Sequence, residues 1–282
     1  MESLLLLFKS FIMGIVEGVT EFLPISSTGH MIIVGKFISF TGTFATLFEV
    51  VIQFGAILAI VVLFRKKLLE SLKTLKPGGF GFKLWTCIIV ALVPAGIVGL
   101  LDKKLLVNKV THVDYISQYM MNPLPVSLAL IVGGIWMLYA EWKYRKAGKC
   151  MQLTDISYKQ ALAIGIFQCL AIVWPGFSRS ASTIIGGWIM GLTTPIAAEF
   201  SFFLAIPAMF FASVGDLATT KIKLTGIEIV SLIVGFVTAF FVALIVVKKF
   251  MEYLKHKPMK PFAIYRLIVG VLLIVLILFK LM

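Results

Sequence analysis

The sequence predicts an all-α polytopic membrane protein, built as an inverted repeat with about six transmembrane helices and two re-entrant helical hairpins. Its 282 residues are 60% hydrophobic and have a mean hydropathy of +1.04, whereas soluble proteins are about half apolar. Its apolar segments fall into a long and a short class, and polar breaks rich in proline, glycine and serine interrupt the short ones. We therefore expect residues 1–282 to form a single integral membrane domain.

Six apolar segments are close to the length of about 20 residues that a helix needs to cross a bilayer. They are approximately Thr46–Phe64, Leu84–Leu101, Leu124–Trp142, Ile196–Val214, Ile227–Val247 and Phe262–Leu281. We expect these six to be the transmembrane helices.

Two pairs of segments predict hairpins that enter the membrane and return to their own side. The first pair is Ser3–Phe22 with Met31–Phe40, and the second is Tyr158–Trp174 with Ala181–Leu192. Irregular backbone at membrane depth must face protein or a water-filled cavity. The turn of each hairpin is therefore a candidate functional site.

Lysine and arginine concentrate in the loops after the first, third and fifth long segments. These residues are Arg65, Lys66, Lys67, Lys73, Lys76, Lys83, Lys143, Arg145, Lys146, Lys149, Lys159, Lys248, Lys249, Lys255, Lys257, Lys260 and Arg266. The opposite loops and the C-terminus hold fewer: Lys103, Lys104, Lys109, Lys221, Lys223 and Lys280. Because basic loops stay cytoplasmic, we expect both termini outside, the first hairpin entering from outside and the second from the cytoplasm. This topology explains the net charge of +13 without a nucleic-acid partner.

The first hairpin carries the segment GIVEGVTEFLPISSTGH, Gly14 to His30. Glu17 and Glu21 are four residues apart and share one face of a helix, which Pro24 then ends. Hydroxyls and an imidazole follow, on Ser26, Ser27, Thr28 and His30. Charged and polar groups inside a membrane indicate a functional site. In the same helix, Gly14 and Gly18 are small residues four apart, which predicts a close approach of another helix.

The chemistry of this segment leaves alternatives open. Any of the three hydroxyls could be a nucleophile, with Glu17, Glu21 or His30 as its base. The two carboxylates could instead hold a divalent cation that bridges phosphate oxygens. Simpler roles are a histidine that only hydrogen-bonds the loop and a Ser26 that caps the following helix.

The second hairpin carries GIFQCLAIVWPGFSRSASTIIGG, which resembles the first segment at an offset of 151 residues. This offset places Pro24 on Pro175, and it also pairs Glu17 with Gln168, Ser27 with Ser178 and Thr28 with Arg179. We therefore expect a duplication, with repeat 1 at about residues 1–110 and repeat 2 at about 155–282. Inverted copies bring broken helices together near the bilayer interior, so the acids of one could meet the arginine of the other.

Arg179 lies between Ser178 and Ser180 at the start of a short helix. Helix N-termini and arginine side chains both bind phosphate oxygens, so this stretch is a candidate anion site. The alternative is that Arg179 only pairs with Glu17 or Glu21 to hold the two hairpins together.

The segments EGVTEFLPISSTGH, Glu17–His30, and PGFSRSAST, Pro175–Thr183, together resemble the undecaprenyl-diphosphate phosphatases, also called bacitracin-resistance proteins. The resemblance implies a hydrolase of the bacterial plasma membrane. It would convert undecaprenyl diphosphate to undecaprenyl phosphate and inorganic phosphate at the outer face. This reaction recycles the lipid carrier for peptidoglycan synthesis and confers bacitracin resistance. The resemblance also implies a homodimer and a divalent cation, Mg²⁺ or Ca²⁺.

Carried over by motif position, the catalytic residues would be Ser27, Glu21, His30 and Arg179. The substrate-binding residues would be Ser26, Thr28, Ser178, Ser180 and Arg179, and the metal ligands Glu17 and Glu21. We expect Ser27 to attack, Glu21 or His30 to take its proton, and Arg179 to bind the diphosphate. A water attack assisted by His30 would use the same residues.

Two other classes of membrane protein share features with this sequence. The acid-phosphatase superfamily requires a histidine after its serine–arginine pair, and Ile185 stands at that position here. A transporter or flippase of undecaprenyl phosphate would also use inverted repeats and broken helices. The concentration of nucleophile, base and arginine favours the enzyme, and phosphate release by the purified protein would discriminate the two.

Overall fold

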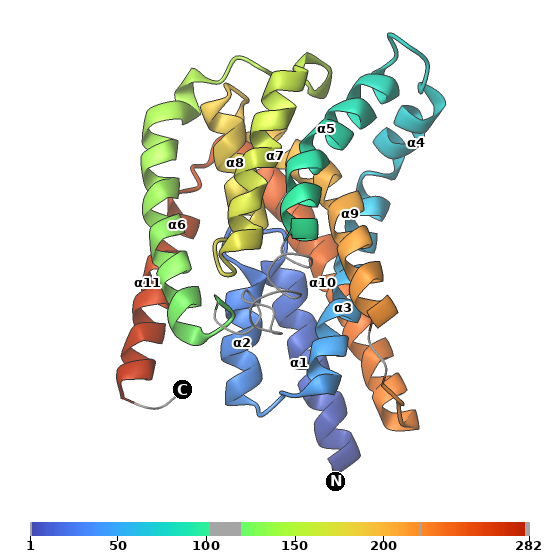
Figure 1. Ribbon diagram of the computed structural model, residues 1–282, viewed down its shortest axis with the longest axis vertical. Coiled ribbons are helices and arrows are strands. Elements are labelled where there is room, and N and C mark those ends of the chain that lie inside the picture. Colours follow the sequence, from blue (N-terminus) through green and yellow to red (C-terminus); the bar gives the residue numbers. More distant parts are fainter. Residues whose placement is uncertain (1, 102–119, 220–221, 280–282) are drawn as a thin grey trace.

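The computed structural model describes residues 2–101, 120–219 and 222–279, in which every named element is a helix (Figure 1). Six long helices match the six predicted transmembrane segments. They are α3 (Thr43–Leu63), α5 (Phe80–Leu101), α6 (Pro123–Tyr144), α9 (Thr194–Thr219), α10 (Gly226–His256) and α11 (Lys260–Leu278). All six are long and apolar enough to cross a membrane, so this part of the prediction is confirmed.

The two predicted hairpins are α1 (Glu2–Thr20) with α2 (Ser27–Phe37), and α7 (Tyr158–Val173) with α8 (Arg179–Ile189). By length and composition α1 could also cross a membrane, which makes seven candidate helices within the described residues instead of six. However, α2 runs back toward the end of the molecule where α1 begins (Figure 1). The first pair therefore folds as a hairpin despite the length of α1.

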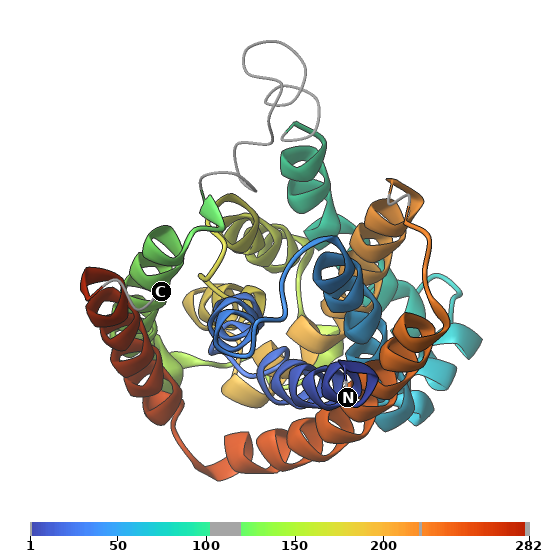
Figure 2. The same cartoon turned by 90° about the horizontal axis from the view of Figure 1, so that it is seen from below.

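The hairpins enter the helical bundle from opposite ends, and their turns lie near its middle (Figure 1). Seen from below, α2 lies inside a ring of the long helices (Figure 2). The polar turns are thus surrounded by protein at the depth where lipid would otherwise meet unpaired backbone.

The basic loops gather at one end of the molecule. This end carries the short helix α4 (Arg65–Lys73) and the turns η3 (Arg145–Ala147) and η4 (Leu153–Asp155), with the start of α7 (Figure 1). Of the opposite group, Lys223 is described, whereas Lys103, Lys104, Lys109, Lys221 and Lys280 lie outside the described residues.

One residue of the basic group was misassigned. Arg266 is not a loop residue, because it lies within α11 and is fully buried. Its guanidinium is satisfied by backbone carbonyls of other elements, which is how a membrane helix can accommodate a buried charge.

Small residues allow the close helix contacts that Gly14 and Gly18 predict. A Cβ on Gly14 would lie 2.7 Å from the carbonyl oxygen of Gly235 in α10, and one on Gly18 would lie 2.8 Å from that of Ala239. These distances are shorter than real Cβ contacts, so α1 can approach α10 this closely only without side chains there.

The alignment of the two hairpins differs by one residue from the predicted offset of 151. Ser26 and Ser178 are the N-cap residues of α2 and α8, and both helices have 11 residues. The helices also end alike: the Phe40 amide bonds the Gly35 carbonyl, and the Leu192 amide bonds that of Gly187. The offset at the turns is therefore 152.

This offset corrects two predicted pairings. Ser178 corresponds to Ser26 and not to Ser27, and Arg179 corresponds to Ser27 and not to Thr28. The shared prolines suggested the other register, but backbone conformation and capping decide the equivalence of residues in a turn.

Candidate active site

Each hairpin turn holds a serine in an unusual backbone conformation. Ser26 has φ 73° and ψ 99°, and Ser178 has φ 75° and ψ 116°. A positive φ in a residue other than glycine costs about 1–3 kcal/mol and occurs preferentially at functional sites. Each side chain caps the helix that follows, because the amides of Gly29 and Ala181 each donate to it at 3.3 Å. The capping role considered for Ser26 is therefore confirmed, and Ser178 has the same role.

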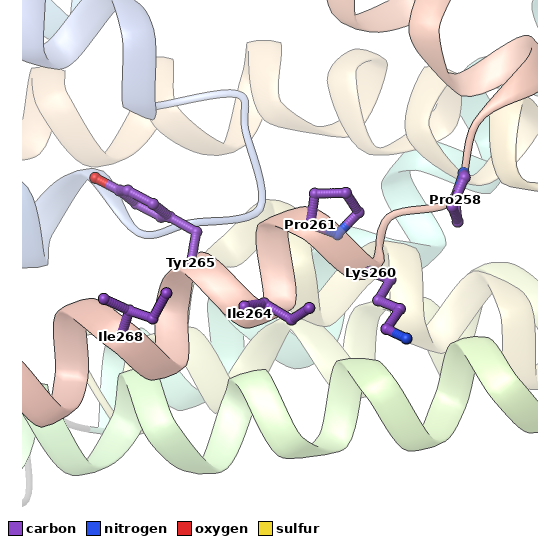
Figure 3. A pocket seen from close by; sticks show the side chains of 6 residues that line it. All are labelled: Pro258, Lys260, Pro261, Ile264, Tyr265 and Ile268. Carbon is purple, nitrogen blue, oxygen red and sulfur yellow. The ribbon is translucent and has the colours of Figure 1, made fainter.

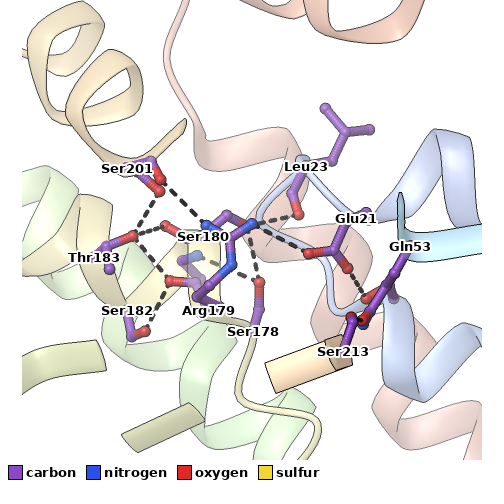
Figure 4. A network of polar contacts seen from close by, with 12 residues as sticks. Glu21, Leu23, Gln53, Ser178, Arg179, Ser180, Ser182, Thr183, Ser201 and Ser213 are labelled. Atoms are coloured by element: carbon purple, nitrogen blue, oxygen red, sulfur yellow. Dashed lines mark hydrogen bonds and ion pairs between the residues drawn. The ribbon is translucent and has the colours of Figure 1, made fainter. Parts of the chain in front are cut away.

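Glu21 connects the two hairpins. The Ser27 hydroxyl donates to Glu21 Oε2 at 2.5 Å. From the other hairpin, Arg179 Nη2 donates to Glu21 Oε1 at 3.1 Å (Figure 4). Glu21 is only 8% exposed, and a hydrogen bond with a charged partner is strong in such surroundings. The expected meeting of an acid from one hairpin with the arginine of the other is confirmed.

The guanidinium of Arg179 keeps binding capacity beyond this ion pair. Its Nη1 donates to the Ser201 carbonyl at 3.3 Å, and its carbon lies 5.8 Å from the centre of the Phe22 ring. Its Nε is buried and has no partner among the described residues. The pairing alternative thus accounts for part of the guanidinium only, because the Nε–H donor has no partner among the described residues.

The serines around Arg179 also tie the hairpins together. Ser180 Oγ donates to the Leu23 carbonyl at 2.9 Å and lies 3.1 Å from Ser178 Oγ (Figure 4). By contrast, Ser27 and Thr28 are partly exposed. The predicted nucleophile Ser27 and the predicted phosphate-binding residue Thr28 are therefore the more accessible hydroxyls, whereas Ser180 is occupied by the contact between hairpins.

Both ring nitrogens of His30 have partners other than Ser27. Its Nδ1 lies 2.7 Å from the Ser26 carbonyl, and its Nε2 lies 2.8 Å from the Tyr265 hydroxyl. Because a carbonyl only accepts, Nδ1 carries the proton of the neutral ring, and Tyr265 donates to Nε2. The two rings stack with centroids 5.5 Å apart. The prediction that His30 hydrogen-bonds the loop is confirmed. A base for Ser27 should accept a hydrogen bond from its hydroxyl, and the residue that does so is Glu21.

Glu17 is a buried acidic residue of the first hairpin whose carboxylate is incompletely paired. It is 3% exposed, and its Oε1 has no hydrogen-bond partner among the described residues. It lies close enough to Glu21, Glu49 and Arg179 for their charges to act on it. Burial of an unpaired carboxylate is costly, so a proton or a cation is required there.

The donor chemistry around Glu17 is compatible with a hard divalent cation. The described residues contain no group of three acidic, histidine or cysteine side chains that could hold a metal alone. Magnesium commonly binds through one or two carboxylates and the phosphates of a substrate. The free oxygen of Glu17 fits that mode, whereas both oxygens of Glu21 are already hydrogen-bonded.

Another acidic residue of the sequence lies outside this arrangement. Glu199, at the start of α9, forms an ion pair with Lys67. It therefore has a structural partner of its own, unlike Glu17.

Sequence reasoning missed two residues next to the site, Tyr265 and Arg266 of α11. Tyr265 bonds His30, and Arg266 bonds carbonyls of both hairpin turns. A signal was available, because Arg266 lies inside the apolar segment Phe262–Leu281, and an ionisable residue within a membrane span is a functional candidate by default.

The fold and the site together define a multi-pass helical membrane protein whose buried site combines a serine, a carboxylate and an arginine from two re-entrant hairpins. Residues 10–272 match the family described as "Bacitracin resistance protein BacA". The chain is 50% identical over 279 residues to the "Undecaprenyl-diphosphatase" of Clostridium tetani, covering 98% of both chains. It is 53% identical over 272 residues to a protein of the same name from Thermoanaerobacter sp., covering 96% of this chain and 97% of the other. The chain belongs to this bacitracin-resistance family.

Proposed function

We propose that the protein hydrolyses undecaprenyl diphosphate to undecaprenyl phosphate and inorganic phosphate. The single observation that carries this proposal is the contact of Ser27 and Arg179 with the same carboxylate, Glu21. A nucleophile hydrogen-bonded to a base beside a phosphate-binding guanidinium is the arrangement that phosphoryl transfer requires. The reaction returns the lipid carrier to peptidoglycan synthesis. The family to which the protein belongs connects the protein with bacitracin resistance.

In the proposed mechanism the Ser27 hydroxyl attacks the terminal phosphorus of the substrate. Glu21 Oε2 takes the serine proton as the bond between Oγ and phosphorus forms. The bond from phosphorus to the bridging oxygen breaks, and undecaprenyl phosphate leaves with the electron pair. Glu21 releases the serine proton to solvent before the second step. Water then attacks the phosphoserine and Glu21 accepts its proton. The bond between phosphorus and Oγ breaks, Glu21 returns this proton to Oγ, and inorganic phosphate departs.

Arg179 stabilises the charge that develops on the transferred phosphoryl group. Its unpartnered Nε is available for a phosphate oxygen, and donors fixed in a dry site stabilise a transition state more than donors in water. Thr28, partly exposed beside Ser27, and Ser26 and Ser178 would complete the phosphate environment. The alternative of a direct water attack assisted by His30 would require the histidine to leave its bonds to Ser26 and Tyr265.

Glu17, with Glu21 as the second carboxylate nearby, would hold the Mg²⁺ or Ca²⁺ ion. When bound, the cation would neutralise charge on the diphosphate oxygens. The support for this assignment is the buried, unpartnered oxygen of Glu17.

We place the protein in the bacterial plasma membrane, with both termini and the substrate side outside. The gathering of basic loops at the opposite end supports this orientation. We further propose a homodimer in the membrane, without a nucleic-acid partner. Labelling of single cysteines placed at Lys223 and Lys66 from outside intact cells tests the orientation: only the first should react.

The enzymatic test uses wild type, Ser27→Ala and Arg179→Ala purified in detergent. Inorganic phosphate released from undecaprenyl diphosphate is measured with Mg²⁺ or Ca²⁺ and then with a chelator. Each variant should lose at least about 10²-fold in rate. The matched controls are Ser127→Ala, a buried serine of α6, and Arg65→Ala in α4, which should stay within about 3-fold of wild type.

Each outcome separates the alternatives. A folded Ser27→Ala variant with full activity would exclude the serine nucleophile and favour water. A folded wild type that releases no phosphate with any cation would leave the flippase of undecaprenyl phosphate as the better account, because transport breaks no bond.

A further inference from the structure

Arg266 has no acidic partner within hydrogen-bond reach in the described part of the chain. It is fully buried in α11, and its guanidinium donates to four backbone carbonyl oxygens. Two of these carbonyls belong to α6: Nε bonds Leu130 at 3.4 Å, and Nη2 bonds Ala129 at 3.1 Å. Because the N–H groups of a buried guanidinium must be paired, these two bonds hold α11 against the backbone of α6.

The other two carbonyls come from the turns of the two hairpins. Nη1 donates to Pro24 of the first turn at 3.3 Å, and Nη2 donates to Gly176 of the second turn at 3.4 Å. One planar guanidinium thus contacts both turns at once. A lysine has a single nitrogen and cannot reach carbonyls in several directions as arginine does.

The surroundings of Arg266 are shaped for this side chain. A Cβ on Gly133 of α6 would lie 2.1 Å from Arg266 Nη2, so only glycine leaves the space that the guanidinium occupies. The ring of Phe177, in the second turn, lies 5.7 Å from the guanidinium carbon. The cavity for Arg266 is therefore built from α6 and the second turn.

Tyr265, the preceding residue, supports the first turn by a separate route. It lines an apolar surface pocket of about 410 Å³ along α11, and in Figure 3 its side chain points from α11 toward the first hairpin. Its hydroxyl bonds His30, which in turn bonds the strained Ser26. Two adjacent residues of α11 thus hold the backbone between Glu21 and Ser27, Arg266 at Pro24 and Tyr265 through His30 at Ser26.

We propose that Arg266 is a positioning residue that sets the two hairpin turns relative to each other, with Tyr265 assisting through His30. This proposal rests on the proposed function, because the distance that it controls is that between Glu21 with Ser27 on one hairpin and Arg179 on the other. Displacement of reacting groups by about 1 Å can cost 10²-fold in rate. Arg266 acts without touching the substrate.

The test compares wild type with Arg266→Lys and Gly133→Ala in detergent. Gly133→Ala displaces the guanidinium and leaves both turns unaltered in sequence. The matched control is Gly134→Ala, whose Cβ would meet Ala263 and Leu267 and not Arg266. In Arg266→Lys and Gly133→Ala we expect kcat for phosphate release to fall about 10-fold or more, with KM within about 3-fold.

Amide hydrogen exchange gives a second measurement that does not depend on the reaction. Residues 23–28 and 174–179 should exchange faster in both variants, while α3 should exchange as in wild type. A merely structural role would instead raise exchange throughout the bundle. Unchanged kcat and unchanged exchange at the turns in the folded variants would overturn the proposal.

Tyr265→Phe keeps the test decisive if the Arg266 variants do not fold. This change removes only the hydroxyl, on a residue that is 41% exposed. We expect kcat to fall about 5-fold or more at unchanged KM, with faster exchange at residues 23–28 alone. If the wild type released no phosphate, the proposed function would fail, but the exchange at the two turns would still confirm or refute the positioning role of Arg266.

Discussion

The hairpin α1–α2 and the hairpin α7–α8 turn through nearly the same backbone. Ser26 and Ser178 share a positive φ of 73° and 75°, and each caps a helix of 11 residues. The helices end in the same pattern, with Ser39 at φ 53° in the first and Gly191 at φ 83° in the second. The geometry of a re-entrant turn has therefore been kept in both.

The chemistry of the two hairpins is different and complementary. The first carries the carboxylates Glu17 and Glu21, whereas the second carries Gln168 and Arg179. The only acid–arginine pair between the hairpins in the described residues is that of Glu21 with Arg179. One backbone motif, used twice in opposite directions, thus brings a carboxylate and a guanidinium into contact, and the pair requires both hairpins.

Neutralising Glu21, which contacts both Ser27 and Arg179, should reduce activity most. Glu21→Gln keeps the shape of the side chain but can neither take up the Ser27 proton nor form an ion pair with Arg179. We expect phosphate release to fall by about 10²- to 10⁴-fold. Glu199→Gln, a buried acid of α9 paired with Lys67, is the control and should stay within about 3-fold. A fully active Glu21→Gln would contradict the assignment of the base.

Glu17→Gln makes the first hairpin resemble the second at this position, where the second has Gln168. We expect a loss of about 10- to 100-fold and a weaker response to chelator, because a ligand of the cation is removed. Gln168→Ala should change the rate by less than about 3-fold. Activity that is unchanged in Glu17→Gln, and still lost with chelator, would remove Glu17 from the cation site.

The two capping serines, Ser26 and Ser178, should contribute equally to the stability of the two hairpins. Ser26→Ala and Ser178→Ala each remove a side-chain acceptor from a helix start, and loss of such a cap costs about 1 kcal/mol. We expect both variants to unfold a few degrees below wild type in a thermal scan in detergent. An effect in one hairpin and none in the other would show that the turns are not equivalent.

The smallest expected effect tests the ends of α2 and α8. Gly191→Ala adds a methyl group where nothing lies within 4 Å, so only the positive φ opposes it, at about 1 kcal/mol. Ser39→Gly should be neutral or slightly stabilising, because Ser39 already has φ 53°. Chemical denaturation of the purified variants gives both differences; a destabilised Ser39→Gly would indicate that the Ser39 side chain has a contact of its own.

Much of the arrangement was available from the sequence, because it rests on local patterns. Segment length separates α3, α5, α6, α9, α10 and α11 from the hairpin helices α2, α7 and α8 but not from α1, which is as long as α11. The first motif carries acids and the second an arginine, so an inverted arrangement of the two hairpins predicts a contact between them. The cap at Ser26 follows from its place after Pro24.

The rest depends on tertiary contacts that no local pattern records. Arg266 was counted with a basic loop, although its partners are carbonyls of Pro24 and Gly176, which are far away in sequence. The sequence left both Glu21 and His30 as possible bases. It contains no sign that the Tyr265 hydroxyl occupies Nε2 of His30. The predicted offset was wrong by one residue at the turns and in the helices that follow them, because residue identities were matched where backbone conformation decides.

The most direct test of the central claim is a double-mutant cycle on kcat/KM for phosphate release, with Glu21→Gln, Arg179→Lys and the double variant. If the two hairpins form one site through this pair, the losses must not multiply. We predict that the double variant is at least about 10-fold more active than the product of the single losses implies. Losses that multiply fully, in folded protein, would show that Glu21 and Arg179 act independently and would contradict a site shared between the hairpins.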